Sequence, residues 1–163
     1  MNIKIKKNGF LIFRGNKIKC AIGKNGLKLN KKEGDKATPK GIFSIGKLYY
    51  RSNRIKLGKL KLIKKQIKKN MGWCHNINNK NYNKEVKFKS YRDAEKLYRN
   101  DHKYNILLVI NTNNNPIKKG AGSAIFLHLT KNYKKTNGCI AIKLDDFKFI
   151  INKINKKTKI IIG

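Results

Sequence analysis

Short runs of β-branched and aromatic residues recur along almost the whole chain, separated by glycine, asparagine and proline. Such runs favour extended strands, and the residues between them favour turns. We expect strands over residues 3–5, 10–13, 18–22, 42–50, 104–110, 124–129, 140–142 and 158–162. Because strands dominate, the chain is expected to fold as a mostly β domain in which helices are minor additions.

Two short helices are expected between these strands. One spans about residues 91–98, where Ser90 is placed to cap its first turn and Asp93 lies within that turn. The other follows Asp145 and Asp146, where apolar residues repeat at helical spacing. Both helices are short, so they decorate a β-rich core and do not form a helical layer.

The chain is expected to form one domain over residues 1–163. This length is usual for a single domain, and no internal repeat or proline-rich linker divides it. Hydrophobic residues make up 39% of the chain, which is enough for a core and excludes compositional disorder. Residues 23–41 carry four glycines and a proline and predict a long irregular loop, whereas residues 57–69 fit neither a helical nor a strand period.

The chain is strongly basic, with 41 lysines and arginines against 8 aspartates and glutamates, a formal net charge of +33. A field of this strength favours anionic partners, and nonspecific, salt-sensitive binding to polyanions is expected. The excess is mostly lysine and is spread along the chain together with abundant asparagine and isoleucine, so an AT-rich genome is the other explanation. A basic nucleic-acid-binding protein is an alternative function, although no recognised binding motif is present.

The number and spacing of the cysteines and histidines match neither a disulfide framework nor a metal site. The three cysteines form no CxxC pair, and their odd number leaves at least one thiol free: Cys20, Cys74 and Cys139. The three histidines show no metal-ligand spacing: His75, His102 and His128. We therefore expect no disulfide framework and no metal site.

No export signal or membrane segment is expected. Residues 1–5 alternate apolar and basic side chains, which is typical of a strand and differs from the continuous apolar stretch of a signal peptide. No later segment is long and apolar enough to cross a bilayer. These features predict a soluble protein, for which a cytoplasmic location is possible.

One pair of residues meets the requirements of acyl transfer by a thiol. This chemistry needs a nucleophilic sulfur, a base beside it and donors for the oxyanion. His128 ends one apolar run and Cys139 begins another, with the polar stretch 130–137 between them. If the two runs are neighbouring strands, both side chains lie at the same end, at the mouth of the connecting loop, within reach of each other. Cys139 is then the nucleophile and His128 its general base.

The glycine before the cysteine supports this hypothesis. Gly138 allows a sharp turn through which main-chain N–H groups can point at an oxyanion. Period-two alternation places Ala141 on the same face as Cys139, which leaves room for a substrate. The alternative is that Cys139 is a small apolar residue entering a buried strand. Of the other candidates, Cys20 is most simply a core residue and His102 lies in a charged, solvated stretch.

Two segments around this pair resemble the catalytic region of YkuD-like L,D-transpeptidases. They are Gly122-Ser123-Ala124-Ile125-Phe126-Leu127-His128 and Thr136-Asn137-Gly138-Cys139-Ile140-Ala141. The upstream residues 34–43 resemble the glycine-and-proline segment that precedes a core strand in this family. Further matches resemble one branch of the family: Trp73-Cys74, Tyr82-Asn83 and residues 113–116. The resemblance covers nearly the whole chain in the same order.

The resemblance implies a β-sandwich-like catalytic domain with a few short α-helices, acting on peptidoglycan stem peptides that end in D-alanine. Cys139 would attack the carbonyl of the third residue, release D-alanine and form a thioester, which an amine or water would resolve. His128 would take the thiol proton while the carbonyl of Leu129 orients its ring. Main-chain N–H groups of Gly138 and Cys139, beside Asn137, would hold the oxyanion, and no cofactor is implied.

Four further residues in the matched segments are candidates for substrate binding: Ser123, Thr136, Trp73 and Tyr82. The implied substrate places the protein in the cell envelope or periplasm, whereas no signal peptide is seen.

Two positions depart from the common family pattern. Asn137 stands where histidine is common, and Ala141 stands where arginine is common. The second change removes a guanidinium that could pair with a substrate carboxylate. A cysteine amidase or hydrolase of a related peptide, on the same scaffold, is therefore the alternative function.

Overall fold

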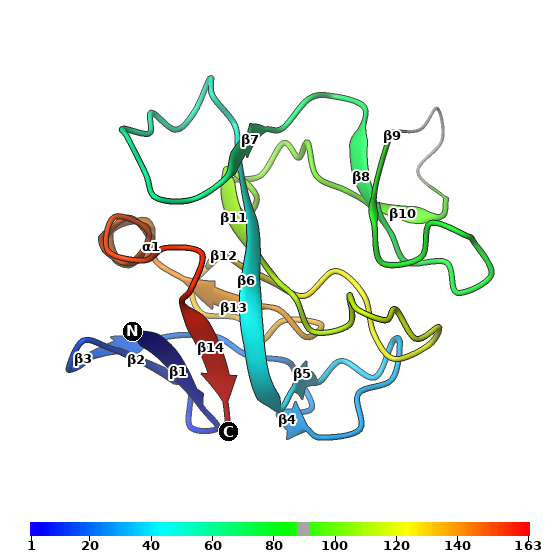
Figure 1. The fold of residues 1–163 in the computed structure, drawn as a ribbon, viewed down its shortest axis with the longest axis horizontal. Helices are drawn as coiled ribbons and strands as arrows, with labels where there is room; N and C mark the ends of the chain where they lie inside the picture. Colours follow the sequence, from blue (N-terminus) through cyan, green and yellow to red (C-terminus); the bar gives the residue numbers. More distant parts are fainter. Residues whose placement is uncertain (88–91) are drawn as a thin grey trace.

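The computed structural model describes residues 1–87 and 92–163, and one long sheet runs through it (Figure 1). The strands of this sheet are β1 (Asn2–Lys6), β2 (Phe10–Phe13), β3 (Asn16–Lys19), β6 (Gly41–Tyr50), β7 (Lys64–Gln66), β11 (Ile106–Ile110), β12 (Phe126–Leu129), β13 (Ile140–Ile142) and β14 (Lys159–Ile162). Their order is β13-β12-β11-β6-β14-β1-β2-β3, with β7 also paired to β6. The mostly β fold expected from the sequence is confirmed.

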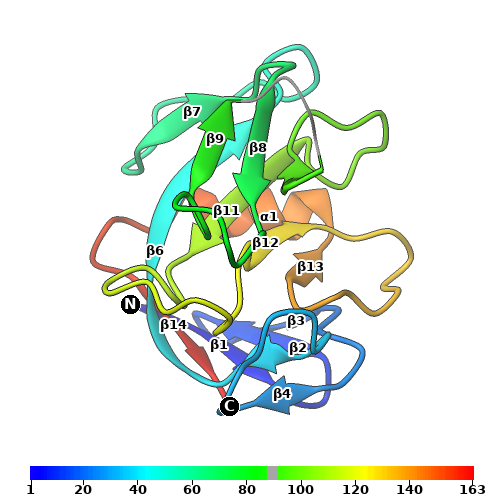
Figure 2. The same cartoon turned by 90° about the vertical axis from the view of Figure 1, so that its right-hand side faces the viewer.

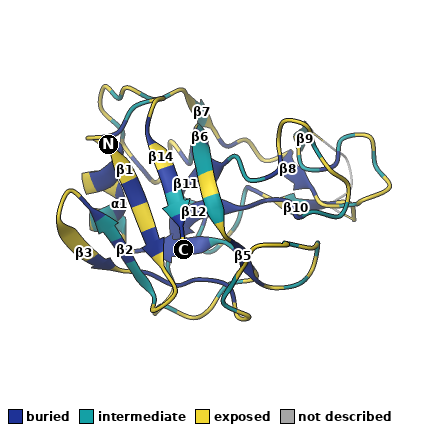
Figure 3. Ribbon diagram, turned by 60° about the horizontal axis from the view of Figure 1, so that its bottom comes forward, coloured by how far each residue is buried: buried dark blue, intermediate teal, exposed yellow. Residues whose placement is uncertain are grey.

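The burial of the strands follows their sequence patterns. β1 alternates, so Ile3 and Ile5 are buried whereas its three polar residues are exposed (Figure 3). β11 is apolar throughout and is buried throughout, as expected for a strand covered on both faces. Strands β1 and β14 pair in parallel, which brings the two termini of the chain to neighbouring strands.

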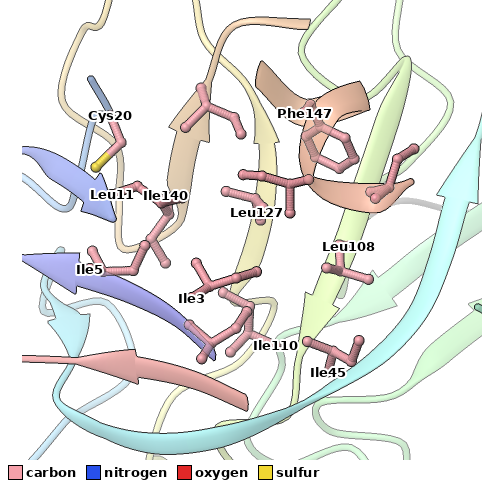
Figure 4. Close-up of a cluster of buried hydrophobic side chains, with 14 of the residues drawn as sticks. Ile3, Ile5, Leu11, Cys20, Ile45, Leu108, Ile110, Leu127, Ile140 and Phe147 are labelled. Carbon is pink, nitrogen blue, oxygen red and sulfur yellow. The ribbon is translucent and has the colours of Figure 1, made fainter. Parts of the chain in front are cut away.

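The sheet curls until its two ends almost meet. After β3 the chain turns back, and Ala21 and Ala141 exchange two backbone hydrogen bonds of 2.8 and 3.0 Å. The enclosed core is filled by aliphatic side chains from opposite sides of the curl, such as Ile3 and Leu127 (Figure 4). The helix α1 (Leu144–Ile151) packs Phe147 into the same core. The result is a nearly closed, sandwich-like barrel.

Two smaller sheets extend this barrel. β8 (Met71–Cys74), β9 (Glu85–Lys87) and β10 (Ala94–Lys96) form a three-stranded sheet, and β4 (Leu27–Lys28) pairs with β5 (Thr38–Pro39). The sheet β8–β10 lies at the opposite end of the molecule from β1–β3 (Figures 1 and 2). A second core cluster, which includes Trp73, Leu97, Tyr104 and Phe126, joins it to the barrel.

One expected helix is confirmed and the other is wrong. α1 forms where Asp145 and Asp146 were expected to begin a helix, and both lie in its first turn. The helix expected over residues 91–98 is absent from its described part, because residues 94–96 form β10 and pair antiparallel with β8. Pairing with β8 and burial of Ala94 and Leu97 outweigh the local capping signal. Ser90 and residue 91 lie outside the described residues.

The irregular segments contain short strands that their sequences did not indicate. Residues 23–41 hold β4 and β5, and residues 57–69 hold β7. Within the described residues, α1 is the one α-helix, and its eight residues are too few to cross a membrane.

Candidate active site

His128 and Cys139 lie on neighbouring strands, but not at one loop mouth as expected. β12 and β13 pair in parallel, so His128 lies opposite Ala141. Cys139 therefore lies beside Phe126, whose N–H points at the cysteine sulfur over 3.4 Å. Residues 130–138 run back along β12 before β13 begins, as a parallel connection requires. The two side chains share one face of the sheet and line the same cavity.

The imidazole of His128 is buried, and its tautomer is set by the backbone. Nδ1 lies 2.9 Å from the carbonyl oxygen of Leu129, an acceptor, so Nδ1 carries the proton and Nε2 has the lone pair. Burial, together with the positive charges of Lys103 and Arg99, lowers the pKa of His128 from 6.5 to about 4, although the hydrogen bond to Leu129 acts in the opposite direction. At neutral pH the ring is therefore uncharged and can accept a proton.

The thiol of Cys139 is also uncharged at neutral pH. Its sulfur donates to the carbonyl of Ala124 over 3.2 Å and accepts the N–H of Phe126. Burial, together with the negative charge of Glu95, raises the pKa of Cys139 from 9.0 to about 12. A neutral thiol and a neutral imidazole that line one cavity have the protonation states that general-base catalysis requires, in which the thiol loses its proton as the sulfur attacks.

A threonine from a distant loop anchors Gly138, the residue before Cys139. The hydroxyl of Thr38 accepts the N–H of Gly23 over 2.9 Å and donates to the carbonyl of Gly138 over 2.8 Å. Gly138 has a φ of +138°, and a Cβ there would lie 2.9 Å from the carbonyl oxygen of Ala37. Only glycine fits this position without a shift of the backbone.

Thr136 makes two further hydrogen bonds to the backbone of Gly138 and Cys139. Its hydroxyl accepts the N–H of Gly138 over 3.1 Å and donates to the carbonyl of Cys139 over 2.6 Å. The N–H of Gly138, an expected oxyanion donor, is therefore engaged by Thr136 in this state. Asn137 between them is exposed and lines the cavity.

One wall of the cavity includes Ser123 and Ala124, and an asparagine outside the cavity holds it in place. Asn83 Oδ1 accepts both the indole N–H of Trp73 (2.9 Å) and the N–H of Ala124 (3.1 Å). Ala124 has a φ of +52°, an uncommon conformation for a residue with a Cβ, and its carbonyl faces the thiol. Asn83 thus holds the N–H of the residue whose carbonyl accepts the hydrogen bond of the Cys139 thiol.

The four candidate substrate-binding residues divide into two groups. Ser123 and Thr136 line the cavity of Cys139. The hydroxyl of Tyr82 is buried behind the wall, where it accepts the N–H of Gly122 over 3.1 Å. Trp73 lines a separate cavity of about 400 Å³ on the far side of Phe126. Trp73 and Tyr82 are therefore placed to support the wall.

The cavity of Cys139 has a volume of about 660 Å³ and a strongly basic lining. Among the described residues, two carboxylates line it, Glu33 and Glu95. Eight cations surround them: Lys24, Lys31, Lys36, Arg99, Lys103, Lys131, Lys134 and Lys135. Residues 1–87 and 92–163 contain no group of three or more His, Cys, Asp or Glu side chains that could hold a metal ion.

Sequence reasoning did not single out three residues of this site. Thr38 lies 100 positions from Gly138, so no local pattern connects them. Glu95 was expected in a helix, and Tyr104 was expected only to open a strand. A polar or aromatic residue that acts through a tertiary contact carries no periodic signal of its own.

Comparison with known proteins identifies the family of this chain. The model of the YkuD family, the L,D-transpeptidase catalytic domain, matches residues 3–162. No curated protein sequence matches significantly. Among solved structures, the helical cell shape determining protein Pgp2 from Campylobacter jejuni aligns with 15% identity and a TM-score of 0.47. The alignment covers 99% of this chain and 46% of that protein, so this chain spans less than half of its length. Since the family model spans nearly all of the sequence, the chain belongs to the YkuD family of L,D-transpeptidase catalytic domains.

Proposed function

We propose that this protein is a cysteine-dependent L,D-transpeptidase that acts on peptidoglycan stem peptides. Cys139 attacks the carbonyl between the third residue and a terminal D-alanine, releases D-alanine and holds the remaining peptide as a thioester. An amine of a second stem or a water molecule then takes the acyl group. The observation that carries the proposal is the cavity that Cys139 shares with a neutral, carbonyl-oriented His128.

The proton follows a closed cycle through His128. Nε2 takes the thiol proton as the sulfur attacks, and the imidazolium is stabilised by the carbonyl of Leu129, which is 2.9 Å from Nδ1. The imidazolium then protonates the departing amine of D-alanine. In the second half, Nε2 takes a proton from the incoming amine or water and returns it to the sulfur.

The oxyanion is assigned to main-chain donors at the nucleophile. The N–H of Cys139 is proposed as the first donor, and Asn137 is proposed to lie at the edge of the oxyanion site. The N–H of Gly138 becomes a second donor when it exchanges the hydroxyl of Thr136, now 3.1 Å away, for the oxyanion. The rigid support of Gly138 by Thr38 keeps these groups in place before the substrate arrives.

The basic lining of the cavity supports a substrate with several carboxylates. A stem peptide carries such groups, including the terminal carboxylate of D-alanine. Ala141 offers no guanidinium, but eight cations from other segments surround the cavity and supply positive charge instead. Peptidoglycan lies in the cell envelope, which is therefore the proposed place of action.

Disaccharide-tetrapeptide fragments of peptidoglycan provide the test. The purified protein is incubated with them, and mass spectrometry follows free D-alanine, the intact mass of the protein and any cross-linked product. Release of D-alanine with a thioester on Cys139 is expected, and Cys139→Ala should abolish both. Cys20→Ala is the matched control, because Cys20 is a core thiol outside the cavity and its loss should leave turnover in place.

The products separate transfer from hydrolysis. A cross-linked dimer, or incorporation of a supplied amine, identifies a transferase. A tripeptide with no incorporation of any amine identifies the hydrolase alternative on the same scaffold. Unchanged D-alanine release by folded Cys139→Ala protein would refute the assignment of the nucleophile.

A further inference from the structure

A buried tyrosine–glutamate pair lies beside the thiol and has no part in the mechanism described above. Tyr104 lies just before β11 and is 5% exposed, and its hydroxyl donates to Oε1 of Glu95. Glu95 comes from β10, in the separate three-stranded sheet. Both residues line the cavity together with His128 and Cys139. Two distant parts of the fold thus place a hydroxyl and a carboxylate next to the proposed catalytic pair.

The ring of Tyr104 is fixed by aromatic contacts. It meets the imidazole of His128 edge-on, with centroids 5.2 Å apart, and the ring of Phe126 at 5.9 Å. Cys139 packs against the same cluster. The position of the phenol is therefore defined by packing, and its hydroxyl need not hold the ring in place.

The surroundings of Glu95 explain why its carboxylate accepts a hydrogen bond from the hydroxyl of Tyr104. Burial raises the pKa of Glu95, while Tyr104 and the charges of Arg99 and His75 lower it and Glu33 raises it. A carboxylate in such a site needs a donor, and the phenol supplies one.

The two groups act on the thiol in opposite directions. The negative charge of Glu95 raises the pKa of Cys139, whereas the hydroxyl of Tyr104 lowers it. The Phe126 N–H and Lys31 also lower it. A donor that stabilises the thiolate thus lines the same cavity as a carboxylate that destabilises it, and in the resting state this donor is hydrogen-bonded to the carboxylate.

We propose that Tyr104 is a further catalytic residue, whose hydroxyl donates to the sulfur of Cys139 once His128 has taken the thiol proton, and that Glu95 is its positioning residue. The proposal rests on the proposed role of Cys139 as nucleophile. The thiol proton moves from sulfur to Nε2 of His128, and Tyr104 keeps its own proton throughout. Only the acceptor of the phenol changes, from Oε1 of Glu95 to the sulfur, and it changes back when the thioester removes the negative charge.

Two conservative substitutions separate the roles, and alkylation of Cys139 by iodoacetamide is the main measurement. The rate is followed between pH 7 and 10 by peptide mapping, which needs no substrate. Tyr104→Phe keeps the ring packing and removes the donor, so alkylation at a fixed pH should slow about tenfold. Glu95→Gln keeps an acceptor for the phenol and removes the charge, so alkylation should quicken several-fold.

A matched control is available in the same core cluster. Tyr49 is also buried, and its hydroxyl donates to Oε2 of Glu85 over 2.6 Å, but it lines the other cavity. Tyr49→Phe should therefore leave the alkylation profile of Cys139 unchanged, although its effect on thermal stability should be similar to that of Tyr104→Phe.

The outcomes distinguish this proposal from the proposed function. Slower alkylation of Cys139 in Tyr104→Phe and faster alkylation in Glu95→Gln support the proposal. Loosened packing alone would change the alkylation rate of both variants in the same direction. An unchanged profile for Tyr104→Phe, or equal shifts for Tyr104→Phe and Tyr49→Phe, would overturn it. Release of D-alanine from stem peptides is scored separately. Its absence in the wild-type protein refutes the substrate and leaves the alkylation result intact.

Discussion

Replacement of Thr38 by valine should both destabilise the protein and change the reactivity of Cys139. Thr38 is fully buried, and its hydroxyl is the only group that valine lacks. The substitution leaves the N–H of Gly23 and the carbonyl of Gly138 without the partner they had at 2.9 and 2.8 Å. Each unpaired buried group costs about 1–3 kcal/mol, so the free energy of unfolding should fall by about 2–6 kcal/mol.

This loss is large compared with the usual stability of a domain, about 5–15 kcal/mol. For a chain of this length each kcal/mol lowers the melting temperature by roughly 2–4 °C, so a decrease of roughly 5–20 °C is expected. Thermal and urea denaturation, followed by circular dichroism, measure it. The iodoacetamide rate of Cys139, measured well below the melting temperature, should also change because Gly138 loses its anchor.

Thr38→Ser is the matched control for this prediction. Serine keeps both hydrogen bonds and loses one buried methyl group, which costs about 1 kcal/mol. Serine should therefore resemble the wild-type protein, whereas valine should not. If valine were as stable as serine and left the reactivity of Cys139 unchanged, the anchoring role of Thr38 would be refuted.

Four further predictions concern the same site. Gly138→Ala should lower both stability and turnover, because its Cβ would lie 2.9 Å from the carbonyl oxygen of Ala37; denaturation and D-alanine release check this. Turnover should fall as the pH falls through about 4, where His128 becomes protonated; a pH–rate profile checks this. The pKa of His128 is lower in the folded protein than the ordinary 6.5, so the neutral ring contributes fully to the free energy of unfolding above pH 6.5. This contribution, up to about 3 kcal/mol, is lost as the pH falls from 6.5 towards 4. The free energy of unfolding should therefore depend less on pH in His128→Asn. Asn83→Ala should reduce turnover more than substrate affinity, because it releases the Trp73 and Ala124 N–H groups that hold the wall; kcat and KM measured separately check this.

The sequence predicted those features that depend on local pattern. The eight expected strands exist, because β-branched runs between turns specify extended chain wherever they pack. The strands that carry His128 and Cys139 are neighbours, and both residues line one cavity. Their parallel pairing was not expected, since a polar loop of this length is equally typical of a hairpin.

Long-range contacts account for what the sequence did not predict. Residues 94–96 become a strand through pairing with β8, which overrides a weak helical signal. The same pairing places Glu95 beside Tyr104, so neither residue could be assigned to the site from its own neighbours. The basic residues around the cavity come from three separate loops. Because lysine is abundant along the whole chain, the sequence does not indicate that these particular residues gather around one cavity.

The position of β14 has a consequence for how this chain acquires its fold during synthesis. β14 lies between β1 and β6 and pairs with both, so β1 is joined to β6 within the sheet through residues 159–162. A ribosome that has released residues 1–150 has produced β1, β2 and β3 without the strand that connects them to β6. Until residues 159–162 emerge, the exposed edges of β1 and β6 are open to chaperones, and the barrel can close only after translation of this last strand.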